Sequence, residues 1–162
     1  MDPRAKRSQA EKIRRRFTRL MQPLGFRRTK TSFWTRGAQP TVEFVHLHLY
    51  SFAPEFRLHV GVRVLNDPFE ALALNGPASH QTDPYDHGFN ESEESVVRCA
   101  YELARYCEDR GEPWFSRWRP PTTLLAEGSP LEPLARAALE RALRGALDEP
   151  SLVRSRSLLG VA

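Results

Sequence analysis

Three histidines, an arginine and a tyrosine occupy alternate positions in two neighbouring stretches of the chain. Residues 41–50 and residues 55–64 both alternate between polar and apolar side chains and are rich in β-branched and aromatic residues, a pattern typical of paired β-strands. Because successive side chains of a strand point to opposite faces of its sheet, the polar residues of such a hairpin would share one face. This histidine patch consists of His46, His48, Tyr50, Arg57 and His59.

The register of the hairpin follows from its loop. Residues 51–54 separate the two stretches and end in a turn-forming proline. With these four residues as the loop, apolar side chains meet only apolar side chains: Leu49 faces Phe56, Leu47 faces Leu58 and Val45 faces Val60. A slip of one residue would set leucine against arginine. The same register puts His46 opposite His59 and His48 opposite Arg57, with their Cβ atoms roughly 5 Å apart.

The histidine patch has three chemical interpretations. Three imidazoles and a water molecule form a common catalytic zinc site, so His46, His48 and His59 are an alternative metal set for a zinc-dependent hydrolase. A pocket for a small anion or peptide, completed by Arg57 and Arg63, is the second interpretation. The third is a half-buried polar face whose histidines bond to the backbone or a nearby carboxylate. Because a neighbouring arginine opposes a cation, we favour no metal, expect no cofactor, and take the patch as a ligand-binding site.

Other residues that could carry chemistry have structural explanations. His80, Asp83 and His87 lie in one predicted loop, but their spacing matches no metal site that we can name, and a solvated loop explains them. Cys99 and Cys107 are eight residues apart in one predicted helix, or about 12 Å, which is too far for a disulfide. We expect both cysteines to be reduced and buried, and we assign no catalytic residue.

Positive charge is concentrated at the start of the chain. Residues 1–36 contain twelve Lys and Arg against two acids, a net charge of +10, whereas the remainder carries −6, giving +4 overall. Such a segment either binds phosphates of a nucleic acid or docks on its own acidic body. The residues of the nucleic-acid alternative are Arg14, Arg15, Arg16, Arg19, Arg27 and Arg28.

The remaining pattern predicts one α+β domain over residues 1–162. An N-terminal helix and a C-terminal helical layer are expected to pack on one face of a meandering antiparallel sheet. Residues 1–8 are expected to form a flexible basic arm, and residues 151–162 a weakly ordered tail. The helix side of the core is predicted to contain Ile13, Phe17, Leu20, Val97, Tyr101 and Leu103.

Start and stop signals give approximate element boundaries. A capping box, Ser8 to Glu11, opens the first predicted helix, and Asn90 is the expected N-cap of a helix that ends at Gly111. A cluster of Trp114, Phe115 and Trp118 follows and is expected to close the core. The predicted elements are a helix over 9–22, a strand over 31–36, a short helical turn over 69–74, a helix over 90–111, a brief helix over 123–126 and a helix over 131–147.

Several of these segments resemble an uncharacterised bacterial family, domain of unknown function 4304. The resemblance covers roughly residues 10–120 and rests on Phe17, Leu20, Leu24–Arg28, Ser32–Arg36, Phe56–Val62 and Gly111–Phe115. It implies an α+β fold but brings no catalytic residue and no cofactor. Members of the family tend to have amide side chains on the polar sheet face where this chain has histidines, so the resemblance does not support an ancestral metal site.

From these observations we expect a non-enzymatic interaction or ligand-binding module, with an immunity or accessory role as one possibility. Its partner would be a protein or a small ligand, with nucleic acid as the alternative; the oligomeric state stays open. No apolar run reaches the ~18 residues of a membrane span, and the N-terminus lacks the apolar stretch of a signal peptide. Together with the reduced cysteines and the excess of 21 Arg over 3 Lys, this points to a bacterial cytoplasmic protein.

Overall fold

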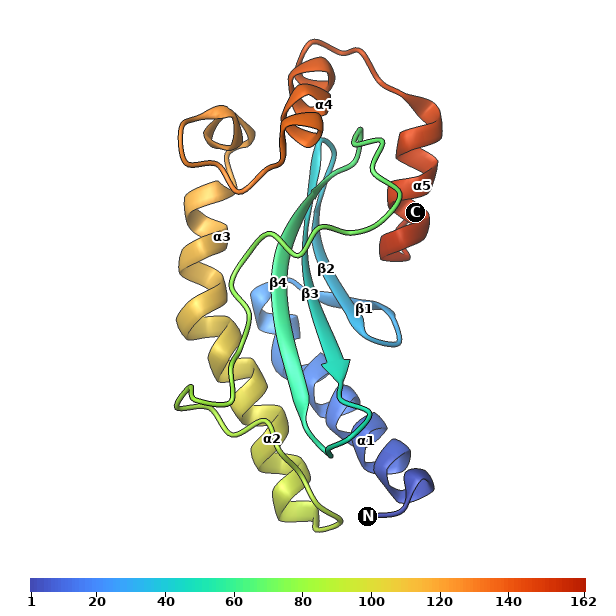
Figure 1. Cartoon of the computed structure of the whole chain (residues 1–162), viewed down its shortest axis with the longest axis vertical. Helices are drawn as coiled ribbons and strands as arrows, with labels where there is room; N and C mark the ends of the chain where they lie inside the picture. The colour runs from blue at the N-terminus through green and yellow to red at the C-terminus, as the bar shows by residue number, and fades with distance from the viewer.

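A four-stranded antiparallel sheet lies at the centre of the molecule (Figure 1). The computed structural model describes all residues from 1 to 162. The strands follow one another in space as they do in the chain, in the order β1-β2-β3-β4. They are β1 (Arg27–Lys30), β2 (Phe33–Ala38), β3 (Thr41–Leu49) and β4 (Phe56–Val64).

Five α-helices accompany the sheet, which confirms the predicted α+β class. They are α1 (Pro3–Met21), α2 (Glu93–Tyr106), α3 (Glu112–Trp118), α4 (Pro133–Leu143) and α5 (Glu149–Leu159). Shorter turns of 3-10 helix cover Gln22–Leu24 and Pro121–Leu125, the second of which confirms the brief helix predicted there, and a π-helical turn covers Cys107–Gly111. None of the helices combines the length and apolar character that a membrane span requires.

The central hairpin has the predicted register. Residues 51–54 form the loop, and the amide of Tyr50 donates to the carbonyl of Glu55 at 3.1 Å. All three apolar pairs form as expected, and His46 faces His59 across the strands. The alternation of the two stretches was therefore sufficient to fix both the pairing and the faces.

The main core lies between the sheet and the pair α1–α2. Ile13 and Phe17 of α1 pack with Leu58 and Leu103 in this core, and all four are fully buried. Burial of side chains of this size stabilises the fold by roughly 1.5–3 kcal/mol each. Three residues predicted for this core are instead exposed, namely Leu20, Val97 and Tyr101, at 39%, 45% and 57%.

The prediction for these three residues is wrong because they lie at the edges of the buried faces of their helices. Residues three or four positions from a buried one stay close to the buried stripe without necessarily facing the sheet. Leu20, Val97 and Tyr101 instead line a shallow apolar groove on the outside of the molecule, together with Ala100 and two arginines.

The first helix begins earlier than its capping box predicted. Asp2 is the N-cap, and its carboxylate accepts a hydrogen bond from the amide of Arg4 at 2.7 Å. The residues expected to form a flexible arm are the first turns of α1, and Lys6 donates to the carbonyls of Tyr50 and Ser51 at 2.5 and 3.0 Å. Asp before Pro is itself a strong helix start, and it prevails over the later signal at Ser8.

Helices α2 and α3 form one continuous rod, so the predicted stop at Gly111 is wrong (Figure 1). The π-helical turn Cys107–Gly111 joins them, and Pro113, which has no N–H to donate, follows this turn at the start of α3. The N-cap of α2 is Ser92, whose hydroxyl accepts from the amide of Ser95, instead of Asn90. Residues 69–74, predicted as a helical turn, are irregular.

The opposite face of the sheet is partly covered, which corrects the prediction of helices on one face only. The tail expected to be weakly ordered forms α5, whose Leu152 and Leu159 bury Val42 and Phe44. A Cβ at Gly61 would lie 2.4 Å from the Phe44 ring, so glycine lets this ring cross β4. Residues 77–79 run along β4 as a strap, with the amide of Ser79 donating to the carbonyl of Leu58 at 2.9 Å.

Candidate functional site

The histidine patch forms on one sheet face as predicted. The rings of His46 and His59 stack with centroids 5.9 Å apart and planes 24° apart. Phe33 stacks on the other side of His46 at 4.5 Å. His48 is exposed and lies edge-on to Tyr50 at 5.6 Å. The patch therefore contains one buried ring, His59, two half-buried rings, His46 and Tyr50, and one exposed ring, His48.

This stacking does not suit a zinc ion. The lone pair of an imidazole nitrogen lies in the ring plane, so stacked rings do not direct their nitrogens at one point. No three His, Cys, Asp or Glu side chains of the chain group in a way that could hold a metal. Burial, with a smaller effect from His48, lowers the pKa of His46 to about 4, and burial followed by Arg57 lowers the pKa of His59 to about 4. Both rings are therefore neutral at pH 7.

Arg63 was expected to complete an anion pocket beside the histidines, but its guanidinium bonds to other residues of the chain instead. Its side chain is only 2% exposed and forms an ion pair with Asp67 at 3.4 Å. The Nε of Arg63 also donates to Ser155 of α5 at 2.9 Å. Arg57 stays with the histidine patch as a half-buried side chain, so the patch has one cation instead of two.

The six arginines of the nucleic-acid alternative do not form one surface. Arg28 pairs with Glu11 at 2.8 Å and covers the Trp34 ring at 5.5 Å. Arg14 covers the ring of Phe56 at 5.4 Å, and Arg16 pairs with Glu93 of α2. The other three, Arg15, Arg19 and Arg27, are exposed.

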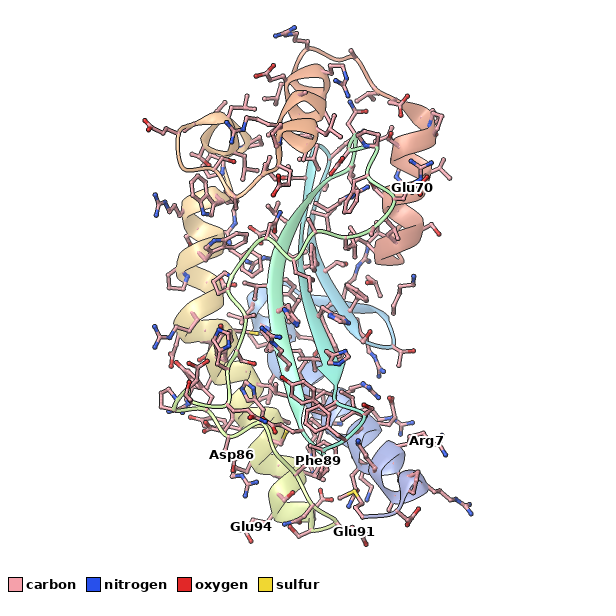
Figure 2. The ribbon with its side chains drawn as sticks, viewed as in Figure 1. Arg7, Glu70, Asp86, Phe89, Glu91 and Glu94 are labelled. Atoms are coloured by element: carbon pink, nitrogen blue, oxygen red, sulfur yellow. The ribbon has the colours of Figure 1, made fainter.

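Acidic side chains accompany the basic end of α1. Figure 2 shows Arg7 extending outward near the N-terminus, at the same end of the molecule as Glu91 and Glu94. A nucleic acid that approached this end would meet both signs of charge, which weakens its attraction to the phosphates.

The loop histidines and the cysteines have structural roles. The carboxylate of Asp83 accepts a hydrogen bond from the backbone amide of His80 at 2.7 Å, as is common in turns. His87 is buried, with 5% of its surface exposed. Cys99 and Cys107 are free and buried, as predicted. Burial raises the pKa of both thiols well above its ordinary value, so neither is a thiolate nucleophile at neutral pH.

A cleft that the sequence interpretation missed lies between the end of the β2–β3 hairpin and α3. Its volume is about 530 Å³, within the range of ligand sites in proteins. One wall is aromatic, with Trp114, Phe115 and Trp118 of α3, and Pro121 of the following turn extends it. We call this the arginine–tryptophan cleft, because two arginines and two tryptophans dominate its lining; the charged lining residues are Arg36, Glu43, Glu112 and Arg119.

These four charged side chains form a closed ring in which positive and negative groups alternate. Glu43, only 7% exposed, accepts from Nε of Arg36 at 2.5 Å and from Nε of Arg119 at 3.0 Å. Glu112 lies 2.9 Å from Nη2 of Arg36 and 3.8 Å from Nη2 of Arg119. The ring therefore has a net charge of zero while holding both guanidinium groups in fixed positions.

Local structure explains why the ring closes. Arg36 and Glu43 are register partners in the β2–β3 ladder, while Glu112 and Arg119 are seven residues apart on the α3 side, or about two helical turns. Arg36 is further fixed by the ring of Phe26, 4.2 Å from its guanidinium carbon, a cation–π contact. The sequence predicted that the strand ends at Arg36, whereas β2 continues to Ala38, and this longer strand is what sets Arg36 opposite Glu43.

Arg119 is the member of the ring that a ligand can reach. Its side chain is 51% exposed, against 17% for Arg36. Glu43 binds it through Nε, so N–H groups of the guanidinium remain for an acceptor. Beside them lie Trp114, which is half-buried, and Trp118. The arrangement suits a ligand that is uncharged, offers carbonyl oxygens and has an apolar part to lie against indole.

Comparisons with protein-family models, with curated proteins and with solved structures find no match to this chain.

Proposed function

We propose that this chain is a non-catalytic binding module that holds an extended, uncharged peptide segment of a partner protein in the arginine–tryptophan cleft. The observation that carries the proposal is the guanidinium of Arg119, fixed by the buried carboxylate of Glu43 at 3.0 Å beside Trp114 and Trp118. Trp and Arg are the side chains most enriched among the residues that dominate binding energy at protein interfaces.

The charge balance of the ring selects the class of ligand. A carboxylate that bound Arg119 would compete with Glu43 and lie close to Glu112. A cation would compete with the two arginines. Backbone carbonyls of a peptide accept from the guanidinium without adding a charge, and a proline or aliphatic side chain can cover the indoles.

Fixed geometry favours binding in this cleft. Since Arg119 is already held by an ion pair, little side-chain freedom is lost when a ligand binds it. The cysteines are buried thiols, and the imidazoles of His46 and His59 are stacked and neutral. Because none of these groups is arranged as an activated nucleophile, they support a binding role over a catalytic one.

The biological setting belongs to the same proposal. The arginine-rich composition and the reduced cysteines support a bacterial cytoplasmic protein. Identification of the bound partner would test whether the chain is an immunity or accessory protein.

The test is a selection of random peptides displayed on phage against the whole chain, followed by titration of the selected peptides. We expect uncharged peptides to be enriched, and the variant Arg119→Ala to lose at least tenfold in affinity, or about 1.4 kcal/mol. Arg144→Ala is the matched control, because Arg144 is an exposed arginine at the C-terminal end of α4 that does not line the cleft. It should bind within twofold of the natural chain.

Two outcomes would contradict the proposal. Equal binding by the natural chain and by Arg119→Ala would show that the peptides bind elsewhere. Enrichment of strongly acidic or basic peptides would show that the neutral ring does not select the ligand.

A further inference from the structure

A second cavity, separate in chemistry from the arginine–tryptophan cleft, lies near the end of β4. Helix α4 lies at this end of the strand (Figure 1). Its volume is about 340 Å³. The end of β4, the loop of residues 67–75 and the start of α4 enclose it. The apolar residues of its lining include Val62, Val64, Phe69, Leu131, Leu134 and Ala135.

The buried arginine at this cavity has no hydrogen-bonding capacity left for a ligand. Nε of Arg63 donates to the hydroxyl of Ser155 at 2.9 Å. Its Nη atoms donate to the carbonyls of Asp67, Phe69 and Ala71 at 2.8–2.9 Å, and one of them reaches the Asp67 carboxylate at 3.4 Å. Arg63 therefore holds the loop in place and does not recognise an anion.

The side chains of Asn75 and Asp67 are also satisfied within the chain. Asn75 accepts from the amide of Val62 at 3.0 Å and donates to its carbonyl at 2.9 Å, as a neighbouring strand would. The second oxygen of Asp67 accepts from the amide of Phe69 at 3.0 Å. The rest of the surface left to a ligand is apolar, and the carboxylate of Glu132 in the lining opposes an anion there, while Asp67 is paired with Arg63.

The apolar surface continues outside the cavity. Two of the lining residues, Phe69 and Leu134, are 49% and 67% exposed, and Leu74 of the same loop is 50% exposed. Exposed apolar side chains that gather around a cavity commonly mark a binding site.

We propose that this cavity binds a small, uncharged, apolar molecule of aromatic or alicyclic type. The ligand is held by contact with the aliphatic lining and covered by Phe69 and Leu134. It carries no carboxylate or sulfonate, because Arg63 is saturated and the carboxylate of Glu132 lies in the lining. This site differs from the peptide cleft, so binding at one does not require binding at the other.

The test uses two fluorescent probes that share a scaffold and differ in charge. N-phenyl-1-naphthylamine is uncharged, whereas 8-anilino-1-naphthalenesulfonate has the same rings and an added anionic group. We expect the uncharged probe to bind the natural chain saturably at one site, and the anionic probe to bind at least tenfold more weakly. Equal affinity of the two probes would overturn the proposal.

Substitutions in one loop locate the site. Ala73 lines the cavity, whereas Ala71, two residues away, is exposed and does not. Ala73→Phe fills the cavity and should weaken binding of the uncharged probe at least tenfold, while Ala71→Phe should leave it within twofold. Unchanged binding by Ala73→Phe would overturn the proposal.

A third variant keeps the test decisive if Ala73→Phe does not fold. Leu134→Glu places a charge at the mouth through a side chain that is already 67% exposed. It should weaken the uncharged probe at least fivefold without affecting peptide binding at the cleft. Displacement of the probe by leucine-rich peptides but not by naphthalene would assign the cavity to a protein partner and reject the small-molecule proposal.

Discussion

Glu43 is the residue on which the geometry of the cleft depends most. It is buried on the helix-facing side of β3 and binds both arginines of the ring. A buried carboxylate is tolerated because two guanidinium groups compensate its lost hydration, and each arginine in turn depends on that carboxylate. Arg36 keeps a second partner in Glu112 at 2.9 Å, so the loss of Glu43 should weaken the ring without unfolding the chain.

We expect Glu43→Gln to lower the free energy of unfolding by about 1–3 kcal/mol, because a buried charged hydrogen bond is lost at two arginines. Urea unfolding followed by circular dichroism measures this change. Glu140→Gln is the control: Glu140 is 49% exposed and lies 4.0 Å from Arg144, so its change should stay within about 0.5 kcal/mol. Equal effects of the two substitutions would show that the ring contributes no more than a surface pair.

The stacked histidines give the fold a pH dependence with a definite sign. The pKa of both His46 and His59 is lowered to about 4 in the folded chain, against roughly 6.5 when unfolded. Between these values the unfolded chain binds more protons, so stability falls as pH decreases from about 6.5 to 4.

Replacement of both rings by uncharged amides should reduce this dependence. We expect the urea midpoint of the natural chain to fall between pH 7 and pH 4.5 by more than that of the double variant His46→Gln, His59→Gln. The remaining fall includes His87, whose pKa is also lowered by burial. His80→Gln, at an exposed histidine, should behave like the natural chain. A double variant as acid-sensitive as the natural chain would contradict the assigned cause.

At the scale of elements, the strands were more predictable than the helices. Each residue of the central hairpin is constrained by a partner across the ladder, so one apolar-to-polar mismatch excludes a register. Helix ends have no such check. The capping box at Ser8 competes with Asp2, and in the structure Asp2 caps α1 while Lys6 of the first turns contacts the hairpin loop.

The cleft could not be predicted for a related reason. Gly111 and Pro113 are ordinary signals for a helix end, so the sequence predicted that the helix stops there. In the structure α2 continues through the π-helical turn into α3. That continuation places Glu112 and Arg119 beside the strands. The histidine patch, in contrast, needed only the hairpin register, so the shared face of its residues was predicted correctly.

Two aspartate substitutions test which helix and strand faces form the core. Leu58 of β4 is fully buried, whereas Val97 of α2, once predicted for the same core, is 45% exposed. Leu58→Asp should abolish the cooperative thermal transition, because it buries an unpaired charge. Val97→Asp should unfold with a midpoint within a few degrees of the natural chain. A folded, soluble Leu58→Asp variant would contradict the assigned core face.

At the scale of the whole molecule, the basic first 36 residues belong to the body of the protein. Arg16 of α1 pairs with Glu93 of α2, and Arg36 of β2 pairs with Glu112 of α3. These contacts join the segment of net charge +10 to the remainder of net charge −6. Steering of an anionic partner by this segment is therefore weaker than the sequence alone indicates.

The three tryptophans report on different parts of the molecule: Trp34 on the main core, and Trp114 and Trp118 on the cleft, although Trp118 also packs in a second apolar cluster. Trp34 is fully buried and its indole N–H donates to Thr18 at 2.9 Å, whereas Trp114 and Trp118 line the cleft. The most direct measurement is a titration of the 15N-labelled chain with a selected uncharged peptide, observed through the indole and imidazole signals. Shifts of Trp114 and Trp118, with Trp34 and the imidazoles of His46, His48 and His59 unchanged, are expected. Shifts confined to the imidazoles, or no shift of either cleft tryptophan at saturation, would contradict binding at the arginine–tryptophan cleft.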